Sequence, residues 1–292
     1  MILYGMTLKK ILSPIFNKSV KHIAGHGIGR NKAVGTVFNY LKSSLKEECV
    51  QIDGHIMYLD KQDSLCLSIN GVYEKFETDL VKREIKKGDV VIDIGANIGY
   101  YTLIFAKLVG DTGKVFAFEP DPTNFELLRK NIEVNGYKNV TLEKKALSDK
   151  EGKVRLTLNK HNTAGHHISS DQQDPKNSIQ IDAIAADDYF KNFEHKIDFI
   201  KMDVEGAESI VLSGMTNILK NSADLKMMVE YNPDAIRDME LEPVSYLELL
   251  VKNGFRMMDI DSKNMKIENT DVQSLVKKYD DEYTNLLCMR ST

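Results

Sequence analysis

Short apolar runs alternate with amphipathic stretches along the chain from residue 88 onward. Most stretches between these runs have the period and length of a helix of about 10–15 residues. Strands that alternate with such helices form βαβ units, in which helices cover both faces of a parallel sheet. We therefore predict an α/β fold with a doubly wound sheet. The predicted strands lie at residues 90–94, 114–119, 140–146, 179–183, 197–203, 225–231, 255–260 and 284–290, with a hairpin near 154–158.

The first 71 residues have a different pattern. Residues 1–45 are predicted to be helical and irregular, and residues 49–70 contain short β-like runs separated by turns. We therefore predict an N-terminal helical and β-hairpin extension over 1–71 and a main domain over 72–292. The β-like runs are residues 49–52, 55–59 and 65–69.

The composition is that of an ordinary globular protein. Of the 292 residues, 42% are hydrophobic and 28% are charged, which argues against a disordered or fibrous chain. The net charge is −4, and because phosphate neutralisation needs a basic excess, we expect no nucleic-acid partner. No apolar run approaches the roughly 20 residues that span a bilayer, so we expect no transmembrane segment.

The cysteines indicate a reducing compartment. Cys49, Cys66 and Cys288 are far apart and form no C-x-x-C pair. Such a scattered, odd-numbered set is typical of reduced thiols and not of a disulfide framework or a zinc site. We therefore predict a cytoplasmic protein.

A glycine-containing loop joins the first predicted strand of the main domain to a helix. It reads Asp93-Ile94-Gly95-Ala96-Asn97-Ile98-Gly99. Glycines at such a loop allow a sharp turn and let the backbone approach a ligand at the helix N-terminus. Glu119 ends the next predicted strand, 24 residues after Gly95 (119 − 95), a spacing at which an acid reaches ribose hydroxyls. The ordered set predicts a nucleoside-containing cofactor; the alternative is a structural turn with a solvated glutamate.

Two cofactors compete for this loop, a nicotinamide dinucleotide and S-adenosylmethionine. A dinucleotide loop normally reads G-x-G-x-x-G because the pyrophosphate must contact the backbone. Here Asn97 takes the place of the middle glycine, and Asp93 lies two residues before Gly95. A carboxylate at that place repels a pyrophosphate but attracts the ammonium group of a methionine moiety. The residues favour S-adenosylmethionine, and an NAD-dependent oxidoreductase stays the alternative.

Four motifs, VVIDIGANIGYYT, FEPDP, ALSD and FIKMDVEGAE, follow one another along the chain. Together they resemble the FkbM family of S-adenosylmethionine-dependent methyltransferases, and the resemblance covers roughly residues 72–232. It implies the class I methyltransferase fold, a Rossmann-like sheet of seven strands with the last strand antiparallel. It also implies methyl transfer, most often to a hydroxyl of a sugar or secondary metabolite.

The resemblance also assigns cofactor contacts by position. The glycine loop would line the methionine part, Glu119 the ribose, and Ala146 and Asp149 the adenine. Tyr101 is expected to border the cofactor, with a place in the core as the alternative. The full set of expected cofactor-binding residues is Asp93, Gly95, Ala96, Asn97, Gly99, Tyr101, Glu119, Pro120, Ala146, Asp149 and Asp203.

Acidic residues follow two of the later predicted strands. Asp203 ends one strand with Glu205 just beyond it, and Glu230 lies near the end of another. Ligands of doubly wound sheets bind outside the carboxyl ends of the strands, so these acids should converge near the sulfonium. They are the candidate bases for a hydroxyl proton, with Lys201 pairing with one of them. The alternative is a structural Lys201–Glu205 pair, with Asp203 capping the next helix.

His166 is a further candidate base. It lies in the polar stretch 161–178, a predicted long loop, and a loop histidine suits general-base catalysis at neutral pH. This stretch resembles the acceptor-side lid of FkbM relatives; the alternative is a solvated polar loop. Glu74 and Glu77, on a helix predicted over 72–87, are expected on a solvated face; the alternative, implied by the FkbM resemblance, is an acid near the mouth of the cofactor site.

The predicted function is methylation of a small hydroxylated acceptor. Oxygens of Asp203, Glu230 and Asn232 offer a place for Mg²⁺, but without a distinctive metal motif we expect no metal. An N-methyltransferase acting on a small molecule or protein is an alternative, although residues 203–206 do not match the [DN]-P-P-[YF] motif. A non-enzymatic scaffold is another, and the chain is open to forming a homo-oligomer.

Overall fold

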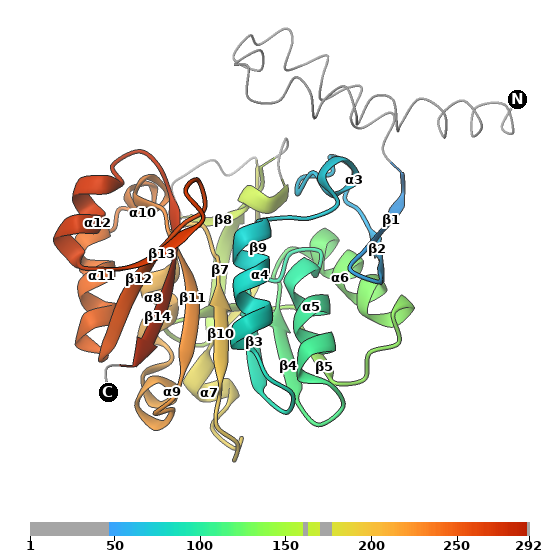
Figure 1. Cartoon of the computed structure of the whole chain (residues 1–292), viewed down its shortest axis with the longest axis horizontal. Helices are drawn as coiled ribbons and strands as arrows, with labels where there is room; N and C mark the ends of the chain where they lie inside the picture. The colour runs from blue at the N-terminus through green and yellow to red at the C-terminus, as the bar shows by residue number, and fades with distance from the viewer. Residues whose placement is uncertain (1–46, 160–162, 170–176, 291–292) are drawn as a thin grey trace, which may run out of the picture.

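The computed structural model describes residues 47–159, 163–169 and 177–290. The segment 1–45, predicted to be helical and irregular, lies outside these residues, as does part of the stretch 161–178. In the described ranges no helix is both long and apolar enough to cross a membrane. The predicted alternation of strands and helices forms a central sheet with helices on both sides (Figure 1).

The central sheet has eight strands in the described part of the chain. β5, β4, β3, β10 and β11 are parallel, and β14 runs antiparallel to both of its neighbours, β11 and β12. This order confirms the predicted doubly wound sheet with its last strand antiparallel. Across the sheet the strands are β13 (Lys266–Thr270), β12 (Phe255–Asp261), β14 (Thr284–Arg290), β11 (Lys226–Tyr231), β10 (Phe199–Met202), β3 (Val90–Ile94), β4 (Lys114–Phe118) and β5 (Val140–Glu143).

The eighth strand, β13, was not predicted from the sequence. It pairs antiparallel with β12 at the edge of the sheet. Its sequence, KIENT, is mostly polar, and none of its side chains is fully buried. An edge strand that faces solvent carries no continuous apolar run by which it can be recognised.

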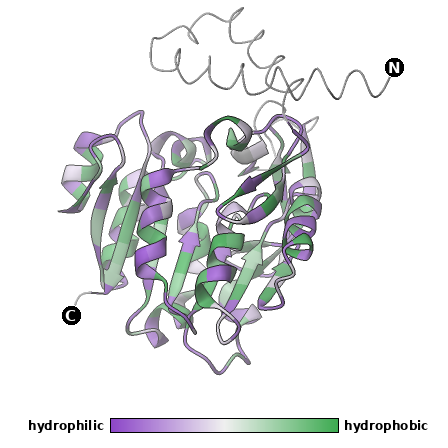
Figure 2. Cartoon of the chain, turned by 45° about the vertical axis from the view of Figure 1, so that its right-hand side comes forward, coloured by the Kyte–Doolittle hydropathy of each residue, from purple (hydrophilic) through white to green (hydrophobic). Residues whose placement is uncertain are grey.

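Both faces of the sheet are covered. Residues along each central strand alternate between two hydrophobic clusters, one on each face. On β3, Ile92 and Ile94 belong to one cluster and Val91 to the other. Successive strand side chains point to opposite faces, so an apolar run such as VVIDI is buried on both sides. Figure 2 shows the hydrophobic colour concentrated on these strands, with hydrophilic colour on the outer helices.

The helices divide between the two faces. One cluster joins the sheet to α4 (Lys75–Glu84), α5 (Tyr100–Val109) and α6 (Pro122–Val134). The other joins it to α7 (Ala186–Tyr189), α8 (Glu208–Ser213), α9 (Thr216–Asn221), α10 (Pro233–Asp238), α11 (Pro243–Lys252) and α12 (Val272–Lys278).

A second, four-stranded sheet follows β5 in the chain. β9 pairs parallel with β6 and antiparallel with β7, and β7 pairs antiparallel with β8, which includes the predicted hairpin. The stretch predicted as a loop over 161–178 therefore contains a strand. The strands are β6 (Ala146–Ser148), β9 (Ser178–Ala185), β7 (Gly152–Thr157) and β8 (His167–Ser169), with a 3-10 turn at Thr163–Gly165.

The described part of the N-terminal extension packs on the main domain. β1 (Cys49–Ile52) and β2 (His55–Tyr58) form the predicted hairpin, and Asn131 of α6 accepts a hydrogen bond from the Tyr58 N–H at 2.7 Å. Nearby, Asn135 accepts from the Ile56 N–H at 2.9 Å. The division of the chain at residue 71 stays a prediction.

The third β-like run, residues 65–69, is not a strand, so that prediction was wrong. It enters a short helix, α3 (Leu67–Asn70). The carboxylate of Asp63 accepts the N–H groups of Leu67 (2.9 Å) and Ser68 (3.1 Å), which satisfies the first donors of the helix. Leu67 and Ile69 are both buried in this conformation. Alternating apolar residues in so short a run do not distinguish one turn of helix from a strand.

Candidate active site

A cavity of about 360 Å³ lies at the carboxyl ends of the central strands. Its walls include the glycine loop after β3, Glu119 after β4, Ala146 of β6 and the acidic residues that follow β10. This is where doubly wound sheets bind their ligands. The sequence therefore predicted the place of the cavity.

The glycine loop passes very close to the end of β10. Gly95 has a φ of 76°, and a Cβ at this position would lie 2.0 Å from the carbonyl oxygen of Asp203. Both the left-handed backbone and the lack of space require glycine here. The loop and the first acid after β10 are thus held against each other.

Backbone N–H groups of the loop find their partners within the protein. Those of Gly95 and Ala96 donate to the Phe118 carbonyl (3.0 Å each), Asn97 to Glu119 Oε2 (2.8 Å), Ile98 to Asn97 Oδ1 (2.7 Å) and Gly99 to the Ala96 carbonyl (2.9 Å). The loop therefore has its conformation fixed from inside. It presents no unused N–H group from residues 95–99 to a bound anion.

Glu119 connects the loop to the strand end. Its two carboxylate oxygens accept the N–H groups of Asn97 and Asp121, each at 2.8 Å, and its side chain is buried. Burial raises the pKa of Glu119 to about 8, although these two donors act in the opposite direction. Each oxygen keeps a further lone pair, so the carboxylate still has room for a ribose diol.

Lys201 is a buried cation at the centre of the site. It pairs in register with Asp93 of β3, and its Nζ lies 3.0 Å from Asp203 Oδ2 and 5.4 Å from the centre of the Tyr101 ring. Burial opposes the charge, but Asp203, Asp93 and Glu74 together raise the pKa of the Lys201 ammonium. The predicted need for a partner is confirmed.

The alternative reading of this segment is not what the structure shows. Lys201 forms its ion pair with Asp203 and not with Glu205. Helix α8 has Ala207 at its N-cap and no side-chain cap, so Asp203 does not cap it.

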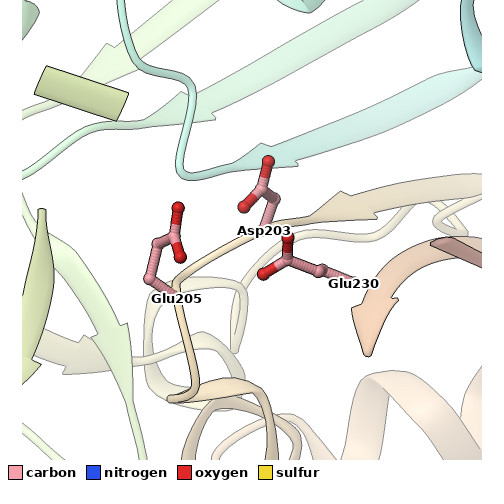
Figure 3. Close-up of side chains that lie close together, drawn as sticks. All are labelled: Asp203, Glu205 and Glu230. Atoms are coloured by element: carbon pink, nitrogen blue, oxygen red, sulfur yellow. The ribbon is translucent and has the colours of Figure 1, made fainter. Parts of the chain in front are cut away.

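Asp203, Glu205 and Glu230 converge, as predicted. Figure 3 shows them meeting from the end of β10, the turn after it and β11, and one oxygen of each lies within 4.8 Å of the others. Burial, followed by the charge of Asp203, raises the pKa of Glu205 to about 8 and that of Glu230 well above its ordinary value.

The turn after β10 fixes the position of Glu205. Glu205 has a φ of 54°, and Gly206 follows with a φ of 97°, where a Cβ would meet the Ala235 carbonyl oxygen at 2.3 Å. The buried carboxylate of Glu208 accepts the N–H groups of Val204 (3.1 Å) and Gly206 (3.3 Å). These contacts hold a non-glycine residue in the left-handed region, a kind of strain that is concentrated at functional sites.

His166 lines the cavity, but its hydrogen bond does not favour a role as base. Its Nδ1 accepts the Asn159 N–H at 3.0 Å, so a neutral ring carries its proton on Nε2. Burial lowers the pKa of His166, which favours this neutral form. In this arrangement the ring offers a donor to a ligand.

Most of the other expected cofactor residues also reach the cavity. Asp93, Ala96, Tyr101, Pro120 and Ala146 line it. Two expected residues do not: Gly99 begins α5 next to Leu128, and Asp149 is exposed. The structure therefore does not bring Asp149 to the proposed adenine end.

The expectation of a solvated face for Glu74 and Glu77 was wrong. Glu74 accepts from the Tyr101 hydroxyl (2.9 Å) and from Asn285 Nδ2 (3.3 Å), and burial raises its pKa to about 7. Glu77 is buried and accepts from Ser262. Strands β12 and β14, far along the chain, cover this face of α4, and no local pattern indicates that.

Several residues of the cavity wall were not predicted from the sequence, among them Ser64, Tyr73 and Tyr283. Ser64 Oγ accepts the Thr163 N–H at 2.9 Å, which ties the N-terminal extension to the segment before β8. No motif marks these residues, because each reaches the site through packing between distant segments.

Comparison with known proteins decides the family. Residues 93–257 match the model described as the methyltransferase FkbM domain. The chain belongs to the FkbM methyltransferase family. The matched range contains the glycine loop, Glu119 and all three converging acids, so the predicted resemblance is confirmed.

Individual proteins similar to this chain match different shares of it. The hexuronic acid methyltransferase AglP of Haloferax volcanii is 32% identical over 143 residues, 49% of this chain and 56% of AglP. The 31-O-demethyl-FK506 methyltransferase FkbM of Streptomyces tacrolimicus is 42% identical over 75 residues, 26% of this chain and 28% of that protein. The chain thus spans little more than half the length of AglP. A SAM-dependent methyltransferase structure from Aquifex aeolicus, 17% identical with a TM-score of 0.42, covers 75% of this chain and 92% of its own.

Proposed function

We propose that this protein transfers a methyl group from S-adenosylmethionine to a hydroxyl of a small acceptor, such as a sugar unit. The observation that carries the proposal is the chemistry of the cavity wall. Carboxylates line it from Glu119 at one side to Asp203, Glu205 and Glu230 at the other, while the N–H groups of the glycine loop are already used. Such a wall suits a nucleoside that carries positive charge.

The same observation argues against a dinucleotide. A pyrophosphate binds to unused N–H groups at a loop and helix N-terminus. Here the loop donors bind Phe118, Glu119 and each other, and the nearest side chains are acidic. A dinucleotide would have to break these bonds and also approach Asp203.

The residues of the cavity suit the parts of the proposed cofactor. S-adenosylmethionine supplies a methyl group that is already activated on a sulfonium. Glu119 has lone pairs for the ribose hydroxyls, and Ala146 and Leu147 form an apolar wall near it for the adenine. Asp93 Oδ1 is buried and has no hydrogen-bond partner within residues 47–159, 163–169 and 177–290, and Lys201 and Asp203 adjoin it, so this end suits the charged methionine groups.

Removal of the acceptor proton falls to the acidic cluster. Asp203 is engaged by Lys201 and Glu230 is deeply buried, whereas Glu205 is partly exposed to the cavity. Its pKa of about 8 makes the Glu205 carboxylate a stronger base than an ordinary glutamate near neutral pH. Support for a sugar acceptor comes from AglP, whose name gives hexuronic acid as its substrate. Tyr283, 58% exposed at the cavity wall, offers an apolar ring face to such an acceptor.

Two measurements test this proposal on the full chain. Calorimetry should detect binding of S-adenosylmethionine and S-adenosylhomocysteine but not of NADH, with Glu119→Ala weakening binding at least tenfold, or about 1.4 kcal/mol. Asp149→Asn is the matched control, because Asp149 lies outside the cavity and the change should have no effect.

The second measurement identifies the acceptor group. Label from methyl-labelled S-adenosylmethionine should pass to uronic acids or neutral sugars and not to amine-bearing analogues with blocked hydroxyls. Binding of NADH in place of the adenosyl compounds would overturn the proposal, and label only on amines would establish an N-methyltransferase.

A further inference from the structure

One carboxylate is enough to accept the proton of a hydroxyl, but three acids, Asp203, Glu205 and Glu230, converge at this place. We propose that these three carboxylates bind a divalent cation of the oxygen-preferring class, such as Mg²⁺, Mn²⁺ or Ca²⁺. The role of this cation in orienting an acceptor rests on the proposed function, whereas its binding does not.

The spacing of the ligand atoms suits such an ion. One oxygen of each side chain lies within 4.8 Å of the other two (Figure 3). Oxygens on opposite sides of one ion are about 4.2 Å apart for Mg²⁺ and about 4.6–5.2 Å apart for Ca²⁺, twice the metal–oxygen distance. The three oxygens can therefore share one ion with small side-chain rotations. Asn232 lines the same part of the cavity.

Glu230 supplies an independent reason to expect a ligand. Its side chain is 7% exposed, and its Oε2 is buried without a hydrogen-bond partner among the described residues. Its cross-strand neighbour, Asn285 of β14, has an amide that donates to Glu74 instead. A buried carboxylate without a donor is destabilising by several kcal/mol, so groups of this kind are usually paired or bind metals.

The charges at the cavity wall leave room for two positive charges. Lys201 is bound to Asp203, and the other lysine of the wall, Lys145, precedes Ala146 in the second sheet. Glu205 and Glu230 form no ion pair with a cationic side chain among the described residues. A divalent cation would displace the protons of these two groups and balance the two negative charges of their carboxylates.

A cation at this place would select acceptors by their oxygens. Two neighbouring hydroxyls, or a hydroxyl and a carboxylate, chelate such an ion and are held next to the methyl donor. The ion also lowers the pKa of a bound hydroxyl. The hydroxyl proton then passes to a free oxygen of Glu205, because each carboxylate has two oxygens.

Manganese binding tests the site without any need for activity. When Mn²⁺ is added to the metal-free full chain, the free-ion electron paramagnetic resonance signal should disappear for one Mn²⁺ per chain. Glu205→Gln and Glu230→Gln should each weaken this binding about tenfold or more. Glu151→Gln, a change at an exposed acid outside the cavity, is the control and should leave binding unchanged. No binding at about 1 mM Mn²⁺, the weak end of protein sites for such ions, would overturn the proposal.

Melting temperatures measured with and without Mn²⁺ show whether a variant that fails to bind the ion is still folded. Glu230→Gln keeps the shape of the side chain but removes a cation ligand, so the metal-free variant should melt close to the metal-free wild type and gain nothing from Mn²⁺. A wild-type gain that persists in this variant would place the ion elsewhere and refute the assignment.

S-adenosylhomocysteine separates this inference from the proposed function. Mn²⁺ should stay bound when S-adenosylhomocysteine is saturating, and displacement would show that the acids belong to the cofactor site, which overturns the inference. Failure of S-adenosylhomocysteine to bind a chain that still takes up Mn²⁺ would remove the proposed function and leave the cation site standing.

Discussion

At the scale of single residues, the site depends on positions where only one residue type fits. Gly95 combines a left-handed backbone with a contact to β10 that leaves no space for a Cβ. Gly136 has nearly the same φ, 74°, but nothing lies within 4 Å of its would-be Cβ. Substitution of Gly136 would therefore introduce backbone strain alone, whereas substitution of Gly95 would add a steric clash.

We expect Gly95→Ala to destabilise the protein much more than Gly136→Ala. Strain at a left-handed residue is worth about 1 kcal/mol, and overpacking against backbone adds about 1–3 kcal/mol or more. Urea unfolding of both variants measures the difference. Equal losses would mean that the loop moves away from β10 without penalty.

At the scale of elements, the predictions that succeeded concern elements buried on both sides. β3, β4, β10 and β11 have continuous apolar runs because helices cover both faces of the sheet. The acids and the glycine loop were found for the same reason, since they lie at or just after the ends of such strands. β13 was missed because an exposed edge strand has no such run.

Parts of the site that come from distant packing were beyond the sequence. Glu74, the N-cap residue of α4, accepts a hydrogen bond from Tyr101 of the cavity wall and another from Asn285, 211 residues later. Ser64 and Tyr283 enter the wall from the N-terminal extension and from the segment before β14. Their neighbours in the chain give no periodic signal of these contacts.

Ser64 provides a test at this scale. Its hydroxyl accepts the Thr163 N–H and donates to Asp60 at 3.1 Å, so it connects the extension to the segment that carries His166. We expect Ser64→Ala to increase hydrogen exchange over residues 163–169 while changing global stability by only about 1 kcal/mol.

Ser68→Ala is the matched control for this effect. Ser68 also donates to an acid, Asp63, but this bond stays within the extension. Exchange over 163–169 should not change in this variant. The same increase in both variants would show that the extension as a whole, and not the Ser64 contact, orders the segment.

At the scale of the whole molecule, buried acids make stability depend on pH. Burial raises the pKa of Glu74 and Glu208 to about 7 and that of Glu119 and Glu205 to about 8, from an ordinary value of 4.5. Between pH 4.5 and about 8 the folded protein therefore holds protons that the unfolded chain has already lost. The free energy of unfolding must fall as the pH rises through this range.

We expect the ligand-free protein to melt at a lower temperature at pH 8 than at pH 5.5. A loss of about 1 kcal/mol lowers the melting temperature of a large domain by about 2–4 °C, and several acids contribute. Scanning fluorimetry in buffers of constant ionic strength measures the trend. Glu119→Gln should flatten it, because one of the titrating groups is gone. A melting temperature that rises between pH 5.5 and 8 would contradict the assigned direction of these pKa shifts.

The internal bonding of residues 95–99 has a consequence for recognition. Phe118, Glu119 and Asn97 already accept hydrogen bonds from backbone N–H groups of the loop, so the loop has its conformation before any ligand binds. Ordering a loose side chain on binding would cost about 0.5–1.5 kcal/mol, and a preorganised loop avoids that loss. Affinity for the adenosyl group should then be governed by the fit of the rigid wall. Ser64, His166 and Tyr283 of the same wall make none of the hydrogen bonds that hold the loop, so variation at these positions is expected to alter the choice of acceptor before it alters the loop.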